Sequence, residues 1–298
     1  MEKRRVLYKG CGCAIITPFT SDHQVACATL EQMTHFHLEN QTDALIVCGT
    51  TGESATMSIH EQEQAIDTVV QAAKGRIPVI AGVGGNDTAK VQTACRTAKR
   101  LGADAVLAVT PYYNKTTQQG LVRHFEAVAD ASELPVILYN VPGRTAMNLE
   151  PATAATLARH ENIIGTKEAS GNIAQITEII QRCGDQLPVY SGNDDSTLPV
   201  LAVGGAGVIS VVANIVPKAM HQLCAAFFDG DIDAARKLQL DLLPLINAMF
   251  IEVNPIPVKE AMALMGFEVG DVRLPLVAMQ PAHKNALIAA MKTWGLVK

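Results

Sequence analysis

Short runs of apolar, mostly β-branched residues alternate along the chain with longer segments of helical periodicity. In segments such as residues 59–73 and 89–101, apolar residues recur at spacings of three and four, which is typical of a helix that buries one face. This alternation predicts repeated βα units, about eight of them. The predicted strands are residues 14–17, 44–48, 79–83, 105–109, 136–139, 163–167, 189–191 and 208–211.

Several predicted strands are apolar at nearly every position, which favours parallel strands covered on both faces. Proline stands directly before three of them, at Pro78, Pro135 and Pro188, and Gly75 and Gly102 follow helical segments as stop signals. Eight βα units close a parallel barrel, so the pattern predicts an α/β protein with a (β/α)8 TIM barrel. A doubly wound open sheet is the alternative, because GVGG at residues 82–85 faintly resembles a dinucleotide loop, although the third glycine of that motif is missing.

After the last predicted strand, helical patterns cover residues 232–251, 257–265 and 282–294, with no strand signal between them. We therefore expect a catalytic barrel domain over residues 1–226 and an appended helical region over residues 227–298. No low-complexity linker separates the two, so we expect the helices to pack on the barrel or on a neighbouring subunit.

Composition excludes some classes of protein. A net charge of −5, a pI near 5.9 and no basic run beyond Lys3–Arg5 make nucleic acid an unexpected partner. The longest apolar stretch, residues 198–216, is interrupted by glycines and contains Asn214, so no membrane span is expected. The seven scattered cysteines are typical of reduced thiols, and we expect a cytoplasmic protein.

The active groups of such a barrel lie at the carboxyl ends of its strands, and Lys167 ends the sixth predicted strand. Strand alternation puts Ile163, Gly165 and Lys167 on one face. If this face is the interior, burial disfavours the ammonium form, and the amine becomes a nucleophile for a carbonyl through a Schiff base. The alternatives are a lysine that reaches solvent or pairs with Glu168.

Tyr139 ends the preceding predicted strand and shares a face with Ile137, so we expect it beside Lys167. A phenol next to an imine can pass protons to and from the carbinolamine and the substrate, although a core aromatic residue is the commoner role.

Two loops offer groups for carboxylates. GTTGES at residues 49–54 presents hydroxyl and backbone N–H groups, or else Thr51 or Ser54 caps the next helix. Arg144, in the loop after the fifth strand, has a guanidinium suited to a carboxylate, or else is a surface arginine.

Other polar residues are expected to have structural roles. Asp194 and Asp195 supply too few ligands for a metal, and a helix N-cap is the preferred interpretation. His35 and His37 are expected at the surface.

The chain carries a long, ordered set of motifs: GTTGES (49–54), TPYYN (110–114), YNVPGRT (139–145), GTKEASGN (165–172), SGND (191–194), GVISV (207–211) and NPIPVK (254–259). Together they resemble the dihydrodipicolinate synthase branch of the pyruvate-dependent aldolase superfamily, nearly end to end. The resemblance implies condensation of pyruvate with L-aspartate 4-semialdehyde to give 4-hydroxy-tetrahydrodipicolinate, toward diaminopimelate and lysine. It implies no cofactor and no metal, and a homotetramer built from tight dimers.

The resemblance also implies roles for single residues. Lys167 matches the Schiff-base lysine, and Tyr139, Thr50 and Tyr113 match a proton relay in which Tyr113 comes from the adjacent subunit. The matched substrate-binding positions are Thr51 for the carboxylate of pyruvate, Arg144 for that of the aldehyde, and Gly192 and Ile209 for backbone contacts.

Sibling branches stay open as alternatives. N-acetylneuraminate lyase and 2-keto-3-deoxy-sugar-acid aldolases share the lysine and tyrosine, but not usually an arginine at the position of Arg144. A non-catalytic barrel that binds a keto acid is the alternative from another class, and borohydride trapping on Lys167 would distinguish it.

The sequence departs from feedback-inhibited members at a site where lysine binds between subunits. Ser54, Ala55, Asn86 and Tyr112 match that site, but its two histidines and glutamate are replaced by Ile59, Gln62 and Lys90. A cation at the last position repels the amines of lysine, so weak or absent inhibition is predicted.

Overall fold

The computed structural model describes residues 6–298, in which eight parallel strands close into one barrel. Each strand pairs with the next in the sequence, and β8 pairs with β1. The predicted (β/α)8 TIM barrel is therefore confirmed, and the open sheet is wrong. The basic run at residues 3–5 lies outside the described residues. The strands are β1 (Gly10–Ala14), β2 (Ala44–Val47), β3 (Val79–Gly82), β4 (Ala105–Val109), β5 (Val136–Asn140), β6 (Ile163–Glu168), β7 (Val189–Ser191) and β8 (Gly207–Ser210).

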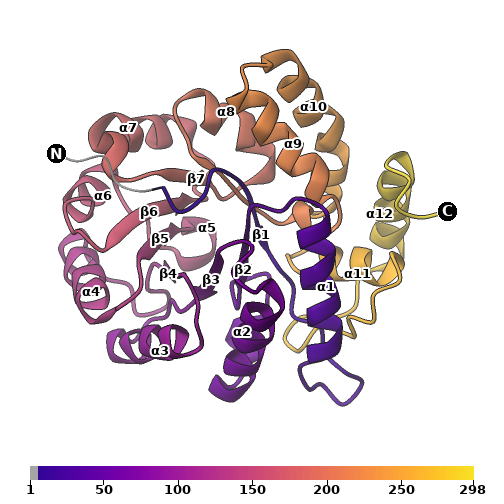
Figure 1. The fold of residues 1–298 in the computed structure, drawn as a ribbon, viewed down its shortest axis with the longest axis horizontal. Helices are drawn as coiled ribbons and strands as arrows, with labels where there is room; N and C mark the ends of the chain where they lie inside the picture. Colours follow the sequence, from indigo (N-terminus) through magenta and orange to yellow (C-terminus); the bar gives the residue numbers. More distant parts are fainter. Residues whose placement is uncertain (1–5) are drawn as a thin grey trace.

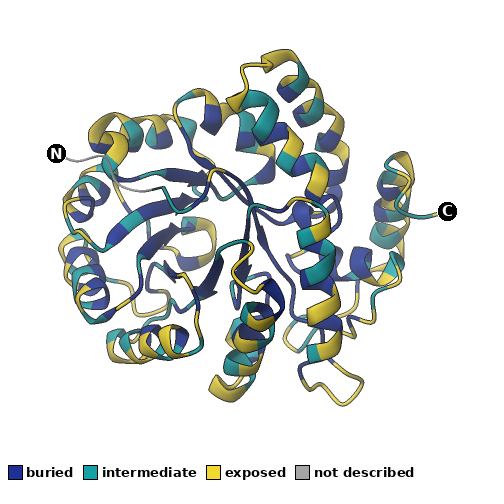
Figure 2. Cartoon of the chain, in the orientation of Figure 1, coloured by how far each residue is buried: buried dark blue, intermediate teal, exposed yellow. Residues whose placement is uncertain are grey.

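Helices surround the strands in a ring, as Figure 1 shows. Figure 2 shows why the strands read as apolar: they are buried, whereas each outer helix is exposed on the side away from the barrel. The barrel helices are α1 (Cys27–Glu39), α2 (Ile59–Ala73), α3 (Thr88–Arg100), α4 (Gln118–Ala131), α5 (Pro142–Thr145), α6 (Pro151–Leu157), α7 (Ile173–Cys183), α8 (Thr197–Ala202) and α9 (Pro217–Phe228). Short 3-10 turns are η1 (Ser54–Thr56), η2 (Gly184–Gln186), η3 (Asp194–Ser196) and η4 (Val212–Asn214).

The C-terminal segment is helical, with α10 (Ile232–Ala248), α11 (Ile256–Leu264) and α12 (Pro281–Thr293) at one side of the barrel (Figure 1). The three predicted helices are thus confirmed with small shifts of their ends. Within residues 6–298, none of the helices has the length and apolar character that crossing a membrane requires.

The barrel interior holds an apolar cluster of its own, separate from the larger core between strands and helices. Tyr8 and Tyr190 stack inside it with ring centres 4.5 Å apart, and the Tyr190 hydroxyl donates a hydrogen bond to the carbonyl of Tyr8 (2.8 Å). Gly165 lies close to the adjacent strand segment, since a Cβ there would lie 3.0 Å from the backbone carbonyl oxygen of Pro188. This tyrosine pair fills the interior toward the amino ends of the strands.

Two strand predictions are corrected by the structure. The first strand begins at Gly10, so the predicted residues 14–17 overlap it only at Ala14. Its sequence GCGCA lacks β-branched residues, and the small Gly12 makes room for Tyr8, so the strand carries little of the usual pattern. In β6, a register irregularity opposite Val136 and Ile137 puts Ile163 in the outer core, whereas Gly165 and Lys167 keep regular pairing.

The glycines of GVGG serve close packing between strand ends. A Cβ at Gly82 would overlap the carbonyl of Cys48, and one at Gly84 would overlap the backbone of Val109. Both positions therefore need glycine for backbone contact inside the barrel wall.

One alternative interpretation and one expectation are wrong. Neither Thr51 nor Ser54 caps the next helix, because Ser58 and Glu61 form a capping box at the start of α2. His37 is fully buried rather than at the surface, with its Nδ1 3.0 Å from Oγ1 of Thr42. The mixed polarity of α1 hides which face packs inward.

Candidate active site

Lys167 and Tyr139 are direct neighbours in the barrel wall. The strand register pairs Tyr139 of β5 with Lys167 of β6. Nζ of Lys167 lies 4.4 Å from the centre of the Tyr139 ring, and the two residues are 6% and 7% exposed. Tyr139 belongs to the interior cluster together with Ile137, so the amine shares an enclosed, largely apolar space with a phenol. The predicted proximity of the two side chains is confirmed.

Glu168 does not pair with Lys167. Its carboxylate accepts hydrogen bonds from Nδ2 of Asn140 (3.0 and 3.1 Å) and from the backbone N–H of Ser170 (2.8 Å). Burial raises the pKa of Glu168, and the hydrogen bonds from Asn140 and Ser170 oppose that shift. Adjacent residues of a strand point to opposite faces, so Glu168 leaves the interior amine to other partners.

The loop after β2 is held by the C-terminal region. Thr51 is 3% exposed, and its Oγ1 accepts a hydrogen bond from Nδ2 of Asn254 (3.0 Å). Two residues further, Glu53 adopts a left-handed conformation and binds Nζ of Lys259 (2.7 Å). Thr50, at the start of the same loop, is half-buried.

Arg144 lies in α5, directly after β5, and remains exposed overall. Its Nη2 donates a hydrogen bond to the backbone carbonyl of Asn254 (3.1 Å). The remaining N–H groups of the guanidinium stay available for an anion at the barrel mouth. Arg144 and Thr51 therefore contact the same residue of the C-terminal region.

Gly192 and Ile209 come from the next two strands. Gly192 follows β7, and its N–H donates to the carbonyl of Glu168 (2.8 Å). A Cβ on Gly192 would lie 2.5 Å from Cβ of Ala169, so only glycine permits this approach. Ile209 of β8 is fully buried in the interior cluster.

Tyr113 is set apart from the other predicted site residues. It follows β4 in a left-handed conformation (φ 67°), and its side chain is 94% exposed. A side chain so exposed is not enclosed by its own barrel. The neighbouring Tyr112 is 40% exposed.

Sequence reasoning missed the role of three buried polar residues near this end of the barrel. Asn254 and Lys259 lie within the NPIPVK motif, which carried a resemblance but no chemical role. The expected helix N-cap is wrong for Asp194, which does not cap its own helix. Its Oδ2 instead accepts hydrogen bonds from the N–H groups of Val211 and Val212 (3.1 and 3.0 Å) at the start of η4. Burial raises the pKa of Asp194, an effect that these hydrogen bonds and the charge of Lys167 oppose.

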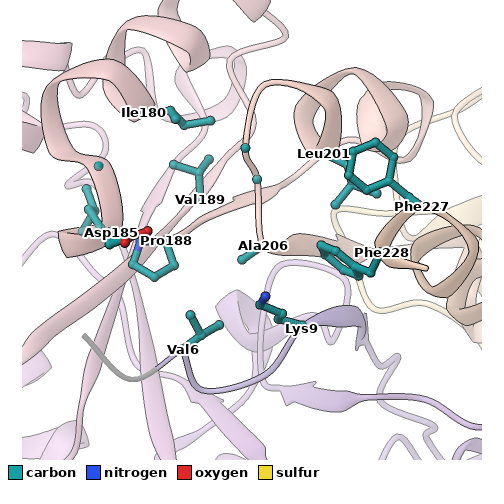
Figure 3. A pocket seen from close by; sticks show the side chains of 14 residues that line it. Val6, Lys9, Ile180, Asp185, Pro188, Val189, Leu201, Ala206, Phe227 and Phe228 are labelled. Atoms are coloured by element: carbon teal, nitrogen blue, oxygen red, sulfur yellow. The ribbon is translucent and has the colours of Figure 1, made fainter. Parts of the chain in front are cut away.

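A cavity of about 260 Å³ lies elsewhere, beside the amino ends of β7 and β8. Figure 3 shows Lys9 and Phe228 close to each other at its edge, with Val6, Pro188 and Ala206 nearby. Nζ of Lys9 is 5.4 Å from the centre of the Phe228 ring. Since Lys167 lies at the carboxyl end of β6, this cavity is not part of the candidate active site.

A closed parallel barrel with an enclosed lysine at a strand end, next to a tyrosine, defines a protein equipped for Schiff-base chemistry. The family model described as "Dihydrodipicolinate synthetase family" matches residues 7–294. The chain belongs to this family, and the predicted resemblance is confirmed.

Relatives match along nearly the whole chain. The 4-hydroxy-tetrahydrodipicolinate synthase of Caldicellulosiruptor bescii is 52% identical over 290 residues, which are 97% of this chain and 98% of the relative. The crystal structure of dihydrodipicolinate synthase from Thermotoga maritima is similar with a TM-score of 0.96 at 42% identity, covering 98% of this chain and 100% of the other. The chloride-inhibited dihydrodipicolinate synthase from Acinetobacter baumannii, complexed with pyruvate, gives a TM-score of 0.95 at 42% identity, with coverages of 97% and 99%.

Proposed function

We propose that this protein is a lyase that condenses pyruvate with L-aspartate 4-semialdehyde to give 4-hydroxy-tetrahydrodipicolinate, on the route to diaminopimelate and lysine. The observation that carries the proposal is the enclosed amine of Lys167, 4.4 Å from the ring of Tyr139. The family supports the same reaction, since its relatives carry that name and one of them was crystallised with pyruvate.

In the proposed mechanism, Nζ of Lys167 attacks the keto carbon of pyruvate, and water leaves to form an imine. The imine withdraws electrons, so a methyl proton is lost and an enamine forms. The enamine carbon attacks the aldehyde carbon of the second substrate, and the new alkoxide takes up a proton. The amine of that substrate then attacks the imine carbon, which closes the ring and releases Lys167.

Proton transfer in these steps falls to Tyr139, Thr50 and Tyr113. In this proposal Tyr139 protonates the leaving oxygen of the carbinolamine, a role supported by its ring lying beside the amine. Tyr113 acts in the site of an adjacent subunit, a role supported by its 94% exposed side chain. A homotetramer built from tight dimers would supply this residue in trans.

Two carboxylates need separate binding groups. The Thr51 hydroxyl binds that of pyruvate, and the Arg144 guanidinium clamps that of the semialdehyde. Gly192 and Ile209 contribute backbone groups near the bound substrate. We further propose a cytoplasmic location, no requirement for a metal or cofactor, a catalytic barrel over residues 1–226 and a helical region over residues 227–298.

The decisive experiment traps the imine with borohydride in the presence of pyruvate. We expect covalent mass on the peptide that contains Lys167, and none in Lys167→Met. The matched control is Lys237→Met, which removes an exposed lysine of α10 and should trap like the wild type. A protein that binds pyruvate without gaining mass would be a non-catalytic binder.

The aldehyde is tested with a panel. Aspartate semialdehyde, N-acetylmannosamine and glyceraldehyde are supplied with pyruvate, and consumption of pyruvate is followed. We expect turnover with aspartate semialdehyde; preference for either of the others would assign the chain to a sibling branch.

A further inference from the structure

We infer that Asn254 is a positioning residue that sets the direction of the hydrogen bond between Thr51 and the carboxylate of pyruvate. The inference rests on the proposed function, because it gives Asn254 a task within the pyruvate site. Asn254 precedes α11, outside the barrel strands, and is 203 positions from Thr51 in the sequence. Among residues 6–298, no hydrogen bond joins the Asn254 side chain to Lys167 or Tyr139, so its effect on pyruvate acts through Thr51.

The contact fixes which partner donates. Nδ2 of Asn254 donates to Oγ1 of Thr51 over 3.0 Å, and the residues are 6% and 3% exposed. A threonine hydroxyl has one hydrogen and two acceptor sites, whereas a carboxylate only accepts. With an amide N–H occupying an acceptor site, the hydroxyl hydrogen of Thr51 is left for the substrate. The hydroxyl is thereby prepared as a donor before pyruvate arrives.

The other end of the same amide supports this interpretation. Oδ1 of Asn254 is buried and has no hydrogen-bond partner among residues 6–298. An unpaired buried carbonyl is unfavourable for folding, so stability alone gives little reason for an amide here. If the amide were turned so that Oδ1 faced Thr51, the Thr51 hydroxyl would donate its hydrogen to Asn254. A substrate carboxylate would then have no donor at Thr51.

Arg144 is connected to the same residue by a different atom. Its Nη2 donates to the backbone carbonyl of Asn254 over 3.1 Å. Substitution of the side chain keeps this carbonyl in place. The side chain of Asn254 should therefore affect pyruvate, and its main chain should affect the semialdehyde.

The test compares Asn254→Ala and Asn254→Asp by steady-state kinetics for both substrates. In Asn254→Ala we expect the KM for pyruvate to rise about five-fold, as for loss of one hydrogen bond, while the KM for the semialdehyde stays unchanged. Asn254→Asp should raise the KM for pyruvate further, because the introduced carboxylate accepts the Thr51 hydrogen. The matched control is Asn247→Ala, at an exposed position of α10.

The order of the two variants separates positioning from packing. Asp has nearly the shape of Asn and Ala leaves a cavity, so a packing role predicts that Asn254→Asp is the milder change. That order, or an equal rise of both KM values, would overturn the inference. If Asn254→Ala does not fold, the shape-conserving Asn254→Asp still gives the pyruvate measurement.

A double-mutant cycle with Thr51→Val adds a second criterion. If Asn254 acts through the Thr51 hydroxyl, Asn254→Ala should add no further rise in the KM for pyruvate once that hydroxyl is gone. Additive effects would contradict the inference. Borohydride trapping of the wild type is run alongside: absence of trapping defeats the proposed function, whereas trapping with an unchanged KM in the variants defeats only the role of Asn254.

Discussion

Lys259 and Glu53 form an ion pair that is almost completely removed from solvent. Nζ of Lys259 is 2.7 Å from Oε1 of Glu53, and each side chain is 2% exposed. Burial lowers the pKa of Lys259, and the charge of Glu53 opposes that shift. Since Glu53 follows β2 and Lys259 lies in α11, the pair fastens the Thr50–Thr51 loop to the C-terminal helices.

Removing one partner should be costly. Lys259→Met leaves a buried carboxylate without its cation, and we expect a loss of about 3 to 5 kcal/mol in the free energy of unfolding, measured in urea. Adding Glu53→Gln should restore part of the loss. Lys237→Met, which breaks an exposed pair with Asp241, is the control and should change stability little. If Lys259→Met lowered the free energy of unfolding no more than Lys237→Met, a stabilising role for the buried pair would be contradicted.

Arg144 should determine the second substrate. In Arg144→Ala we expect kcat/KM for aspartate semialdehyde to fall, because one partner of a charge-assisted pair is lost. The fall should correspond to a loss of at least about 2 kcal/mol in transition-state binding. Trapping of pyruvate on Lys167 should persist, which serves as the internal control. Unchanged kinetics would favour a sibling aldolase.

Feedback by lysine should be weak or absent. Ile59 is 74% exposed, Nε2 of Gln62 donates to the carbonyl of Ser54 (3.0 Å), and the Lys90 side chain is 86% exposed. These residues offer the amines of lysine no anion and one repelling cation. Steady-state assays with added L-lysine check this, with Lys90→Glu as the variant in which sensitivity should increase. An inhibition constant in the micromolar range for the wild type would contradict the prediction.

His37 should make stability depend on pH. Burial lowers its pKa from 6.5 to about 3, so in mildly acidic solution the unfolded chain takes up a proton that the folded chain does not. Above pH 6.5 the contribution of His37 to the free energy of unfolding does not change with pH. On acidification the free energy of unfolding falls by about 1.4 kcal/mol per pH unit between pH 6.5 and 3. Unfolding measured from pH 4 to 7 should show a smaller slope in His37→Gln than in the wild type. His35→Gln, at a partly exposed position, should keep the slope.

The thiols should differ sharply in reactivity. Six cysteines are buried, and burial raises the pKa of Cys48 to about 12 and of Cys95 and Cys183 to about 11, whereas Cys27 is partly exposed. Because the thiolate is the reactive form, a thiol reagent should modify Cys27 alone in the native protein. Cys27→Ser should remove that reaction, and rapid labelling of further thiols in this variant would contradict the burial described.

The barrel was predictable because its signal is local. Strands buried on both faces leave continuous apolar runs, and helices between them leave a three-to-four spacing. The exceptions follow the same physics: β1 is built from glycine, cysteine and alanine, and the irregularity in β6 reverses the face of Ile163. Neither a small-residue strand nor a register shift changes the periodicity enough to be recognised.

The candidate site also has a part that was predictable from local sequence and a part that was not. The sequence alone determined that a lysine and a tyrosine end successive strands, and in a parallel barrel this order makes Lys167 and Tyr139 neighbours. Only the tertiary structure decided that Asn254 meets Thr51 and that Lys259 meets Glu53, across 203 and 206 positions of chain. Hydrogen bonds and ion pairs act over a few ångströms in space. The periodicity of a sequence does not indicate which distant side chains come within that distance when the chain folds.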